Sequence, residues 1–272
     1  MNVNGKAATP VSNRLLTGSL LSDPEHLHGG LEPVTLEPGE VLCHSGEEIH
    51  YVYFPNNGLI SLVATMMDGT TVETGIVGRE GMIGVPVLLG AGSAPYRAIV
   101  QVAGSAWRMR TEAFRNELHH NPAFHSRLLL YTEALMIQMS QMAACNCLHS
   151  VEERLCSLLL MVHDRTDGGQ FCLTHEAIAD MLGTRRAGVT VAAGKLRQAG
   201  VISYVRGHIH ILDRYSLETE ACECYHTVRA EFSRLLEAEP PREFSPLHQA
   251  IQWNGSGVSA GLNQGRESIR VT

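Results

Sequence analysis

The sequence predicts an α+β fold in which two domains are joined by one long helix. Three observations support this prediction: β-rich runs punctuated by glycine over residues 31–111, helix-forming residues over 123–147, and two short helical segments followed by a hairpin after residue 171. A chain of 272 residues is long enough for two domains that each bury a core.

Glycine recurs at short intervals in the N-terminal part, and strand-like runs lie between the glycines. These runs are Tyr51–Phe54, Leu59–Val63, Thr71–Thr74 and Ala98–Val102. Many short strands separated by turn residues favour an antiparallel barrel or jelly roll. Asp68-Gly69, between two strand-like runs, is a strong hairpin signal. We therefore expect a β-roll over residues 14–122.

A long helix is expected over residues 123–149, after the break at Asn121-Pro122. Apolar residues recur along it every seven residues, a pattern typical of helices that pair with a second copy. We expect a homodimer through a seam of four residues: Leu128, Leu135, Met139 and Met142. The alternative is a helix that packs only on its own domain, because the heptad run is short.

The C-terminal domain, residues 150–238, contains the motif with the most specific spacing. Thr174 is placed to cap a first helix, and Gly183 to end it. Thr184 is placed to cap a second helix, which Gly200 ends. Two short helices with a glycine at the turn between them form a helix-turn-helix, in which the second helix enters the major groove of DNA.

A hairpin and a group of cations accompany these two helices. Residues 201–212 alternate apolar and polar side chains around Arg206-Gly207, which predicts the wing of a winged helix-turn-helix. The formal net charge of the chain is −7, yet residues 171–215 are locally basic, and nucleic acid responds to the local charge. An ordinary helical hairpin with solvated charges is the alternative. The residues expected to contact DNA are Thr174, Thr184, Arg185, Arg186, Thr190, Lys195, Arg206 and His208.

Together these features resemble the Crp/Fnr family of transcription regulators, which includes the catabolite activators. The resemblance covers roughly residues 31–212 and rests on the roll, the long helix and the block over 173–202. It implies a cyclic-nucleotide-binding-type β-roll as sensor, a central dimerisation helix and a C-terminal winged helix that binds a palindromic site. It places the base-reading arginine at Arg186. Where catabolite activators have a base-reading glutamate and a second arginine, this sequence has Ala187 and Val191, so the operator sequence is not implied.

The resemblance also points to an effector pocket at Gly84, Val85, Tyr96 and Arg97. In cyclic-nucleotide relatives, a Gly-Glu-Leu turn and an Arg-Ser pair hold the cyclic phosphate through backbone amides and the arginine charge. Here the turn is Gly84-Val85-Pro86 and the pair is Tyr96-Arg97. The glutamate is absent, the proline removes an amide donor, and the arginine is displaced by one residue. Ordinary cAMP binding is therefore not expected, and the effector is unknown.

The seven cysteines allow two interpretations. No cysteine precedes Cys43, so the N-terminal iron-sulfur cluster of some family members is not expected. Two groups could each form a soft-metal site: Cys145, Cys147, His149 and Cys156 near the hinge, and Cys222, Cys224 and His226 further on. Their one-residue spacings do not match the usual zinc patterns. Reduced thiols that pack between helices, with no metal, are therefore the favoured interpretation.

The expected partners are double-stranded DNA, a second copy of the chain, a small-molecule effector and, for an activator, RNA polymerase. No membrane partner is expected, because no apolar run approaches the roughly 18 residues needed to span a bilayer. Residues 1–10 lack the apolar segment of a secretory signal, so a cytoplasmic location is expected. The sequence shows no nucleophile paired with a base, no phosphate-binding loop and no metal triad, so an enzyme is not expected. The alternative function is a ligand-sensing module that acts through protein partners. Residues 239–272 are expected to be a disordered tail.

Overall fold

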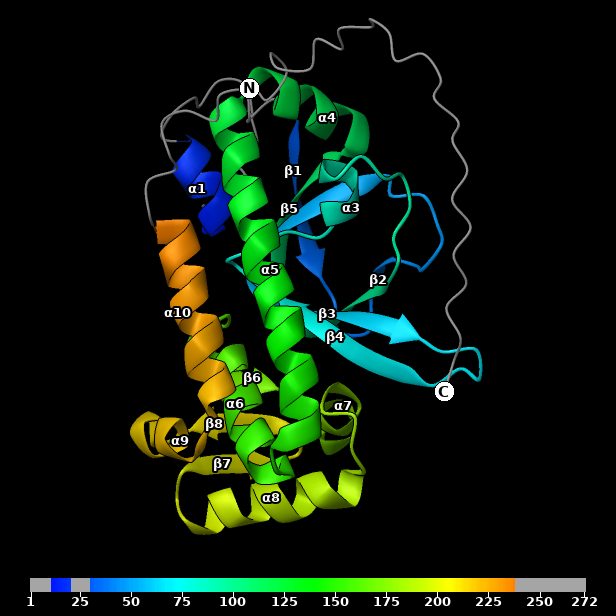
Figure 1. Cartoon of the computed structure of the whole chain (residues 1–272). Helices are drawn as coiled ribbons and strands as arrows, with labels where there is room; N and C mark the ends of the chain where they lie inside the picture. Colours follow the sequence, from blue (N-terminus) through cyan, green and yellow to red (C-terminus); the bar gives the residue numbers. More distant parts are fainter. Residues whose placement is uncertain (1–10, 21–29, 238–272) are drawn as a thin grey trace, which may run out of the picture. The chain divides into compact units, whose positions relative to one another are not determined.

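The computed structural model describes residues 11–20 and 30–237, which form a β domain, a long central helix and a C-terminal domain (Figure 1). This arrangement confirms the predicted α+β fold. The expected tail, 239–272, lies outside the described residues. In the part of the chain that the structure describes, no helix combines the length and the apolar character needed to cross a bilayer.

Five strands form one antiparallel sheet in the β domain. They are β1 (Leu31–Leu36), β2 (Val41–Cys43), β3 (Tyr51–Thr65), β4 (Thr71–Val77) and β5 (Arg97–Arg110). The order is β1-β5-β3-β4, and β2 also pairs with β5. The predicted hairpin at Asp68-Gly69 joins β3 to β4, with Gly69 at φ 86°. Three helices complete the domain: α1 (Arg14–Leu20), α3 (Val85–Leu88) and α4 (Thr111–His120).

β3 is one bent strand, whereas the sequence predicted two separate runs. The bend lies at Gly58, which has φ 88°, and a Cβ at this position would lie 2.7 Å from the backbone oxygen of Val102. The pairing of β3 with β5 shifts register on both sides of Gly58. Because glycine tolerates both the left-handed backbone and the close approach, the strand continues through an irregularity that would otherwise end it.

The central helix α5 (Pro122–Leu148) begins where the sequence predicted, and the Asn121 side chain accepts a hydrogen bond from the Phe124 N–H at 2.9 Å. Its first turns pack into a cluster of three aromatic rings, Phe54, Phe114 and Phe124, whose centroids lie 6.2 to 6.3 Å apart. These rings come from β3, α4 and α5. They join the start of the long helix to the core of the β domain.

Two buried polar contacts continue this attachment along α5. The Tyr131 hydroxyl donates to the backbone oxygen of Met82 at 3.2 Å. The side-chain oxygen of Gln138 accepts a hydrogen bond from the Ile76 N–H on β4 at 2.8 Å, and Gln138 is fully buried. Because hydrogen bonds are directional, these contacts fix how far α5 is rotated about its own axis.

This rotation turns part of the predicted dimer seam toward the β domain. Leu128 is fully buried and Leu135 is 5% exposed, and both belong to the core of the β domain. Of the other two seam residues, Met139 packs against the same core and Met142 is half-buried. Consecutive residues of a helix point about 100° apart, so the adjacent row is the one turned outward. On that row, Leu129 is 36% exposed and Met136 is 63% exposed.

The C-terminal domain combines helices with a small sheet. Its elements are α6 (Val151–His163), β6 (Gln170–Cys172), α7 (His175–Met181), α8 (Arg186–Gln198), β7 (Ile202–Val205), β8 (His208–Ile211) and α9 (Arg214–Glu220), and the strand order is β6-β8-β7. Leu59, Ile76 and Val102 of the β domain belong to the same hydrophobic core as this domain. The two domains are therefore packed together and not merely tethered.

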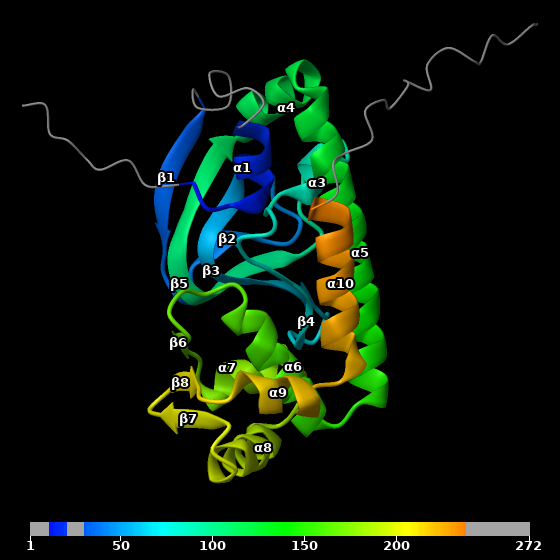
Figure 2. The same cartoon turned by 90° about the vertical axis from the view of Figure 1, so that its left-hand side faces the viewer.

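A last helix, α10 (Glu223–Glu237), returns from the C-terminal domain and lies beside α5 (Figures 1 and 2). Its apolar side chains complete the core of the β domain: Val228, Phe232, Leu235 and Leu236. The rings of Tyr131 and Phe232 have centroids 6.4 Å apart. This return was not predictable from the sequence, because the apolar face of an amphipathic helix does not indicate which surface it packs against.

A buried ion pair reinforces the contact between the domains. Arg165, just after α6, lies 2.7 Å from Glu80 of the β domain, and the two side chains are 7% and 8% exposed. Nearby, Arg79 pairs with Asp167 at 2.6 Å. A buried charge that loses its partner is strongly unfavourable, so the pair of Arg165 with Glu80 favours one relative placement of the two segments that carry it.

Shortening the side chain at the α10 contact tests its contribution to stability. Phe232→Ala removes a ring that is 6% exposed and leaves a cavity against Tyr131. We expect the free energy of unfolding to fall by about 3–5 kcal/mol, measured by urea denaturation. Thr227→Ala, at an exposed position on α10, is the control and should change it by less than about 0.5 kcal/mol. Equal effects of the two substitutions would contradict the packing described here.

A second test uses Glu73 on β4, which is 4% exposed. Burial raises the pKa of its carboxyl group to about 8, and the hydrogen bond from the Ser61 hydroxyl opposes the shift only in part. The folded chain therefore keeps a proton on Glu73 that the unfolded chain releases near the ordinary value of 4.5. Between these values the folded state binds more protons, so its stability falls as the pH rises, by at most about 1.4 kcal/mol per pH unit for one group.

Glu73→Gln should remove this part of the pH dependence, because the amide does not titrate. Urea midpoints measured across the window between the two pKa values, for the wild type and the variant, give the two slopes. Glu112→Gln, at an exposed position on α4, should keep the wild-type slope. A Glu73→Gln protein whose slope equals that of the wild type would show that Glu73 does not hold a proton in the folded state.

Candidate nucleic-acid interface

Helices α7 and α8 form the predicted helix-turn-helix. The Thr174 hydroxyl caps α7 by accepting a hydrogen bond from the Ala177 N–H at 3.1 Å, as predicted. Gly183, at φ 56°, lies at the predicted end of the helix. The second cap differs from the prediction. The residue before α8 is Arg185, which makes no side-chain capping bond, and Thr184 is half-buried in the turn.

The outer face of α8 is cationic at its first turn. Arg185 and Arg186 are both exposed, and the Arg186 side chain is 69% exposed. Its nearest carboxylate, that of Glu176, lies 3.8 Å away and is itself 67% exposed. An exposed pair of this kind contributes little, so the guanidinium group remains available to another partner. On the opposite face, Val189, Ala192, Ala193 and Leu196 are buried.

His175 connects the two helices and the wing, and it was not among the predicted site residues. Its ring stacks on Tyr204 of β7 with centroids 4.3 Å apart, and its Nδ1 lies 3.0 Å from the Thr190 hydroxyl. Thr190 in turn donates to the backbone oxygen of Arg186 at 3.0 Å. Burial lowers the pKa of His175, and the charge of Arg186 lowers it further, which favours the neutral imidazole. A histidine directly after the helix cap was the available signal.

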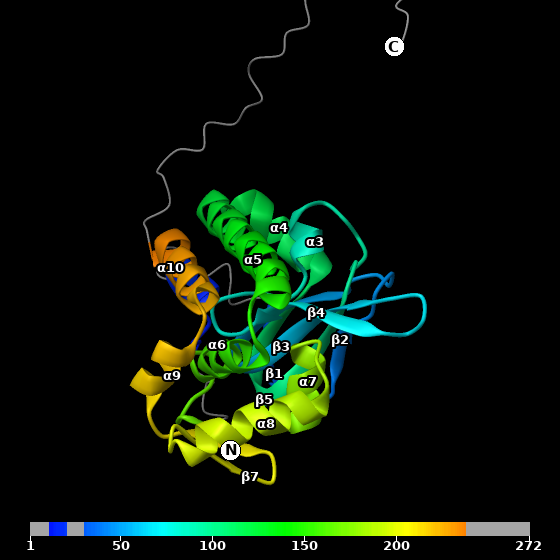
Figure 3. The same ribbon diagram turned by 60° about the horizontal axis from the view of Figure 1, so that its bottom comes forward.

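The predicted wing is present. β7 and β8 pair in antiparallel register from Ile202 with Ile211 to Val205 with His208. The turn between them has Arg206 at φ 50° and Gly207 at φ 87°, the two positive values that a type I′ hairpin requires. Arg206 and His208 are both exposed at this tip. Figures 1 and 3 show the hairpin beside α8, with which β7 is in contact.

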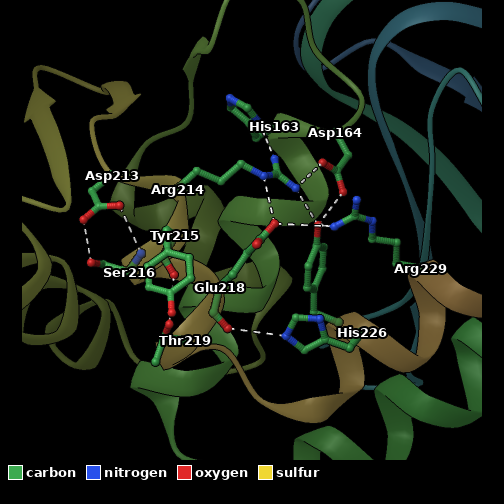
Figure 4. A network of polar contacts seen from close by, with 11 residues as sticks. His163, Asp164, Asp213, Arg214, Tyr215, Ser216, Glu218, Thr219, His226 and Arg229 are labelled. Atoms are coloured by element: carbon green, nitrogen blue, oxygen red, sulfur yellow. Dashed lines mark hydrogen bonds and ion pairs between the residues drawn. The ribbon is translucent and has the colours of Figure 1, made fainter.

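Two cations of the basic segment have partners within the chain. Lys195 on α8 forms an ion pair with Glu152 of α6, although both side chains are at least half exposed. Arg214 is the centre of a polar network that joins the end of α6 to α9 and α10 (Figure 4). Its guanidinium group lies 2.8 Å from Asp164 and 2.9 Å from Glu218, and it donates to the Tyr225 hydroxyl at 2.6 Å. Burial is the largest single effect on Arg214 and disfavours its charge, but Asp164, Tyr225 and Glu218 together outweigh it, so the pKa of Arg214 is raised.

The candidate effector residues are partly brought together. Gly84, at φ 106°, begins α3, and a Cβ there would lie 2.7 Å from a methyl carbon of Val52. Val85 is 7% exposed. Burial raises the pKa of Tyr96, and a hydrogen bond with the Gly84 backbone partly opposes this rise. Arg97, half-buried on β5, pairs with Val63 of β3. The turn is thus packed by the chain's own side chains.

Comparisons with known proteins agree with this architecture. Two family models match in succession: a cyclic nucleotide-binding domain over residues 33–121 and a Crp-like helix-turn-helix domain over residues 153–220. The global nitrogen regulator of Nostoc sp. is 25% identical over 188 residues, which make up 64% of this chain and 83% of that protein.

Solved structures show the same fold. FixK2 from Bradyrhizobium japonicum has a TM-score of 0.61 at 16% identity, with 71% of this chain and 98% of that chain covered. A transcriptional regulator of the CRP family from Thermus thermophilus has a TM-score of 0.57 at 22% identity, with coverages of 69% and 96%. With a cyclic-nucleotide-binding-type domain followed by a Crp-like helix-turn-helix, the chain belongs to the Crp/Fnr family of transcription regulators and not to a family of enzymes.

Proposed function

We propose that this regulator is a cytoplasmic protein that binds a palindromic DNA operator as a homodimer, with α8 in the major groove. The observation that carries the proposal is the cationic first turn of α8 beside the wing, where Arg185, Arg186 and Arg206 are all exposed. A chain with a formal net charge of −7 needs such a local cationic face to approach the phosphate backbone.

The geometry of α8 supports insertion into DNA. A helix of 13 residues is about 20 Å long, and a groove about 12 Å wide admits it. Residues near the N-terminus of a recognition helix are those that face the base edges, and Arg186 is the first residue of α8. The wing residues Arg206 and His208, and the exposed Thr190, are placed to contact phosphate oxygens.

An exposed apolar row on α5 supports dimerisation. Leu129, Met136 and Ala143 are exposed and lie seven residues apart, so they share one face of the helix. Large apolar side chains in a row are unfavourable in water and are typical of a contact surface. We therefore assign the dimer seam to this row, next to the one that the heptad pattern first suggested. Two copies would present their α8 helices to half-sites about one helical turn apart.

We propose that the β domain senses a signal, and that it does so without the contacts by which relatives ordinarily bind cAMP. The support is the absent glutamate, the proline at position 86 and the packed turn at Val85. RNA polymerase is a further proposed partner if the protein activates transcription. The alternative, a module that acts only through protein partners, differs in its response to salt, because DNA binding weakens steeply as the salt concentration rises.

Replacing the proposed base-reading residue tests the DNA interface. Arg186→Ala should weaken specific binding by about 1–3 kcal/mol and relax selectivity at one base, because it removes a bidentate donor. Arg115→Ala, at an exposed position on α4, is the charge-matched control and should bind as the wild type does. A gel-shift titration with cognate and scrambled operators measures both effects. If Arg186→Ala still preferred the cognate over the scrambled operator as strongly as the wild type does, Arg186 would not be the base-reading residue.

A charge on the exposed row tests the dimer. Met136→Glu should raise the dimer dissociation constant at least tenfold, since about 1.4 kcal/mol corresponds to tenfold and an unpaired charge buried in an interface costs more. Ala123→Glu is the control, because this exposed residue of α5 lies outside the row. Sedimentation velocity over a concentration series gives the constants. If both variants dimerise equally well, the seam lies elsewhere.

A further inference from the structure

Three cysteines and one histidine meet where the central helix ends and α10 begins. They are Cys145, His149, Cys222 and Cys224, and their four potential ligand atoms all lie within 4.8 Å of one another. Cys145 is in the last turns of α5, and His149 is its C-terminal cap. Cys222 and Cys224 lie on either side of Glu223, the first residue of α10. Two segments far apart in the sequence thus contribute two potential ligands each.

Two of the spacings between these atoms are close to the edges of a tetrahedral metal site. The sulfurs of Cys145 and Cys222 are 3.5 Å apart, and the sulfur of Cys224 is 3.4 Å from Nδ1 of His149. With Zn–S bonds of about 2.3 Å and Zn–N bonds of about 2.0 Å, a tetrahedron has S–S edges of about 3.8 Å and S–N edges of about 3.5 Å. All three cysteines are free thiols.

The surroundings also have the character of a metal site. Nδ1 of His149 faces the sulfurs, while its Nε2 lies 3.2 Å from the Glu223 carboxylate. A metal-binding histidine ordinarily uses its second nitrogen in this way. Gln141 donates a hydrogen bond to the Cys224 sulfur at 3.2 Å, and the Ser157 hydroxyl lies 3.1 Å from the Cys222 sulfur. Such donors orient thiolate ligands and stabilise their charge.

The alternative of simple apolar packing accounts for these cysteines less well. They are 4 to 8% exposed, but they form a small cluster of their own, separate from both hydrophobic cores. Three sulfurs and an imidazole select a soft or borderline cation over Mg²⁺ or Ca²⁺, which prefer oxygen. A binuclear iron-sulfur cluster would spread its ligands over two iron atoms, whereas these four atoms all lie within 4.8 Å of one another. Zn²⁺ fits this donor set and geometry.

We propose that Cys145, His149, Cys222 and Cys224 bind one Zn²⁺ ion, which fastens the start of α10 to the end of α5. With four protein ligands the site is closed, as in zinc sites that stabilise structure. Binding releases the thiol protons, since the ligands are thiolates. The other candidates do not take part: Cys147 is exposed, Cys156 packs in the hydrophobic core of the C-terminal domain, and His226 faces the backbone oxygen of Glu218 at 3.4 Å. The sequence prediction of no metal rested on the spacing within each group, and the fold combines ligands from both groups.

Metal analysis of the full chain, purified without added metal or chelator, tests the proposal. Elemental mass spectrometry should find one zinc ion per wild-type chain. Cys147→Ser, the matched control, should also contain one. Cys222→Ser and His149→Ala should bind Zn²⁺ more than about 100-fold more weakly, because loss of an outer-shell partner alone costs 10–100-fold. Equal zinc content in Cys222→Ser and Cys147→Ser would refute the assignment.

A second measurement begins with the wild-type chain, so its main result does not depend on the folding of a variant. Co²⁺ added to the metal-free wild-type chain should give the absorption of a tetrahedral ion with sulfur charge-transfer bands, and Zn²⁺ should displace it. His149→Cys adds a fourth thiolate and should raise the charge-transfer intensity by about one third. A wild-type chain that binds neither Zn²⁺ nor Co²⁺, or that carries a Cys145–Cys222 disulfide when isolated under reducing conditions, overturns the proposal.

Discussion

The attachment of one face of α5 to the β domain is the constraint on which the rest of the structure depends. Gln138 and Tyr131 are almost fully buried, and each makes a hydrogen bond to the backbone of the β domain. Turning the helix about its axis would leave buried polar groups without partners, at about 1–3 kcal/mol for each. The helix is therefore held in one orientation. This orientation buries Leu128 and Leu135, turns Met136 outward and leaves room beside α5 for α10.

The C-terminal domain is held to the β domain from two sides. α10 places Phe232 and its neighbours in the core of the β domain, and the pair of Arg165 with Glu80 joins the segment after α6 to the same domain. The network around Arg214 connects α6, α9 and α10 (Figure 4). Because breaking a buried ion pair leaves an uncompensated charge, a displacement of Glu80 would act directly on the segment that carries Arg165.

For DNA binding, the positions of the charged side chains in this chain matter more than its net charge. The basic segment over residues 171–215 contains cations with different roles. Arg214 is half-buried among its carboxylate partners and Lys195 pairs with Glu152, whereas Arg185, Arg186 and Arg206 are exposed around α8 and the wing, and Arg186 has only the long, exposed pair with Glu176. Counting residues therefore overestimates the charge of the DNA-facing surface, and only the contacts distinguish the two groups. The remaining exposed cations are Arg185, Arg186, Arg197 and Arg206, which lie on α8 and the wing, so the cationic face is small and directional.

Features set by neighbouring residues were determined by the sequence alone: the Thr174 cap, the glycine at 183, the Arg206-Gly207 turn and the long helix after Asn121. Each depends on backbone chemistry within about four residues, which a local pattern records. Only the tertiary structure decided which apolar row of α5 is exposed, that α10 packs beside α5, and that Cys145 lies beside Cys222, 77 residues away. These features depend on contacts between distant segments, and periodicity within one segment carries no information about its partner.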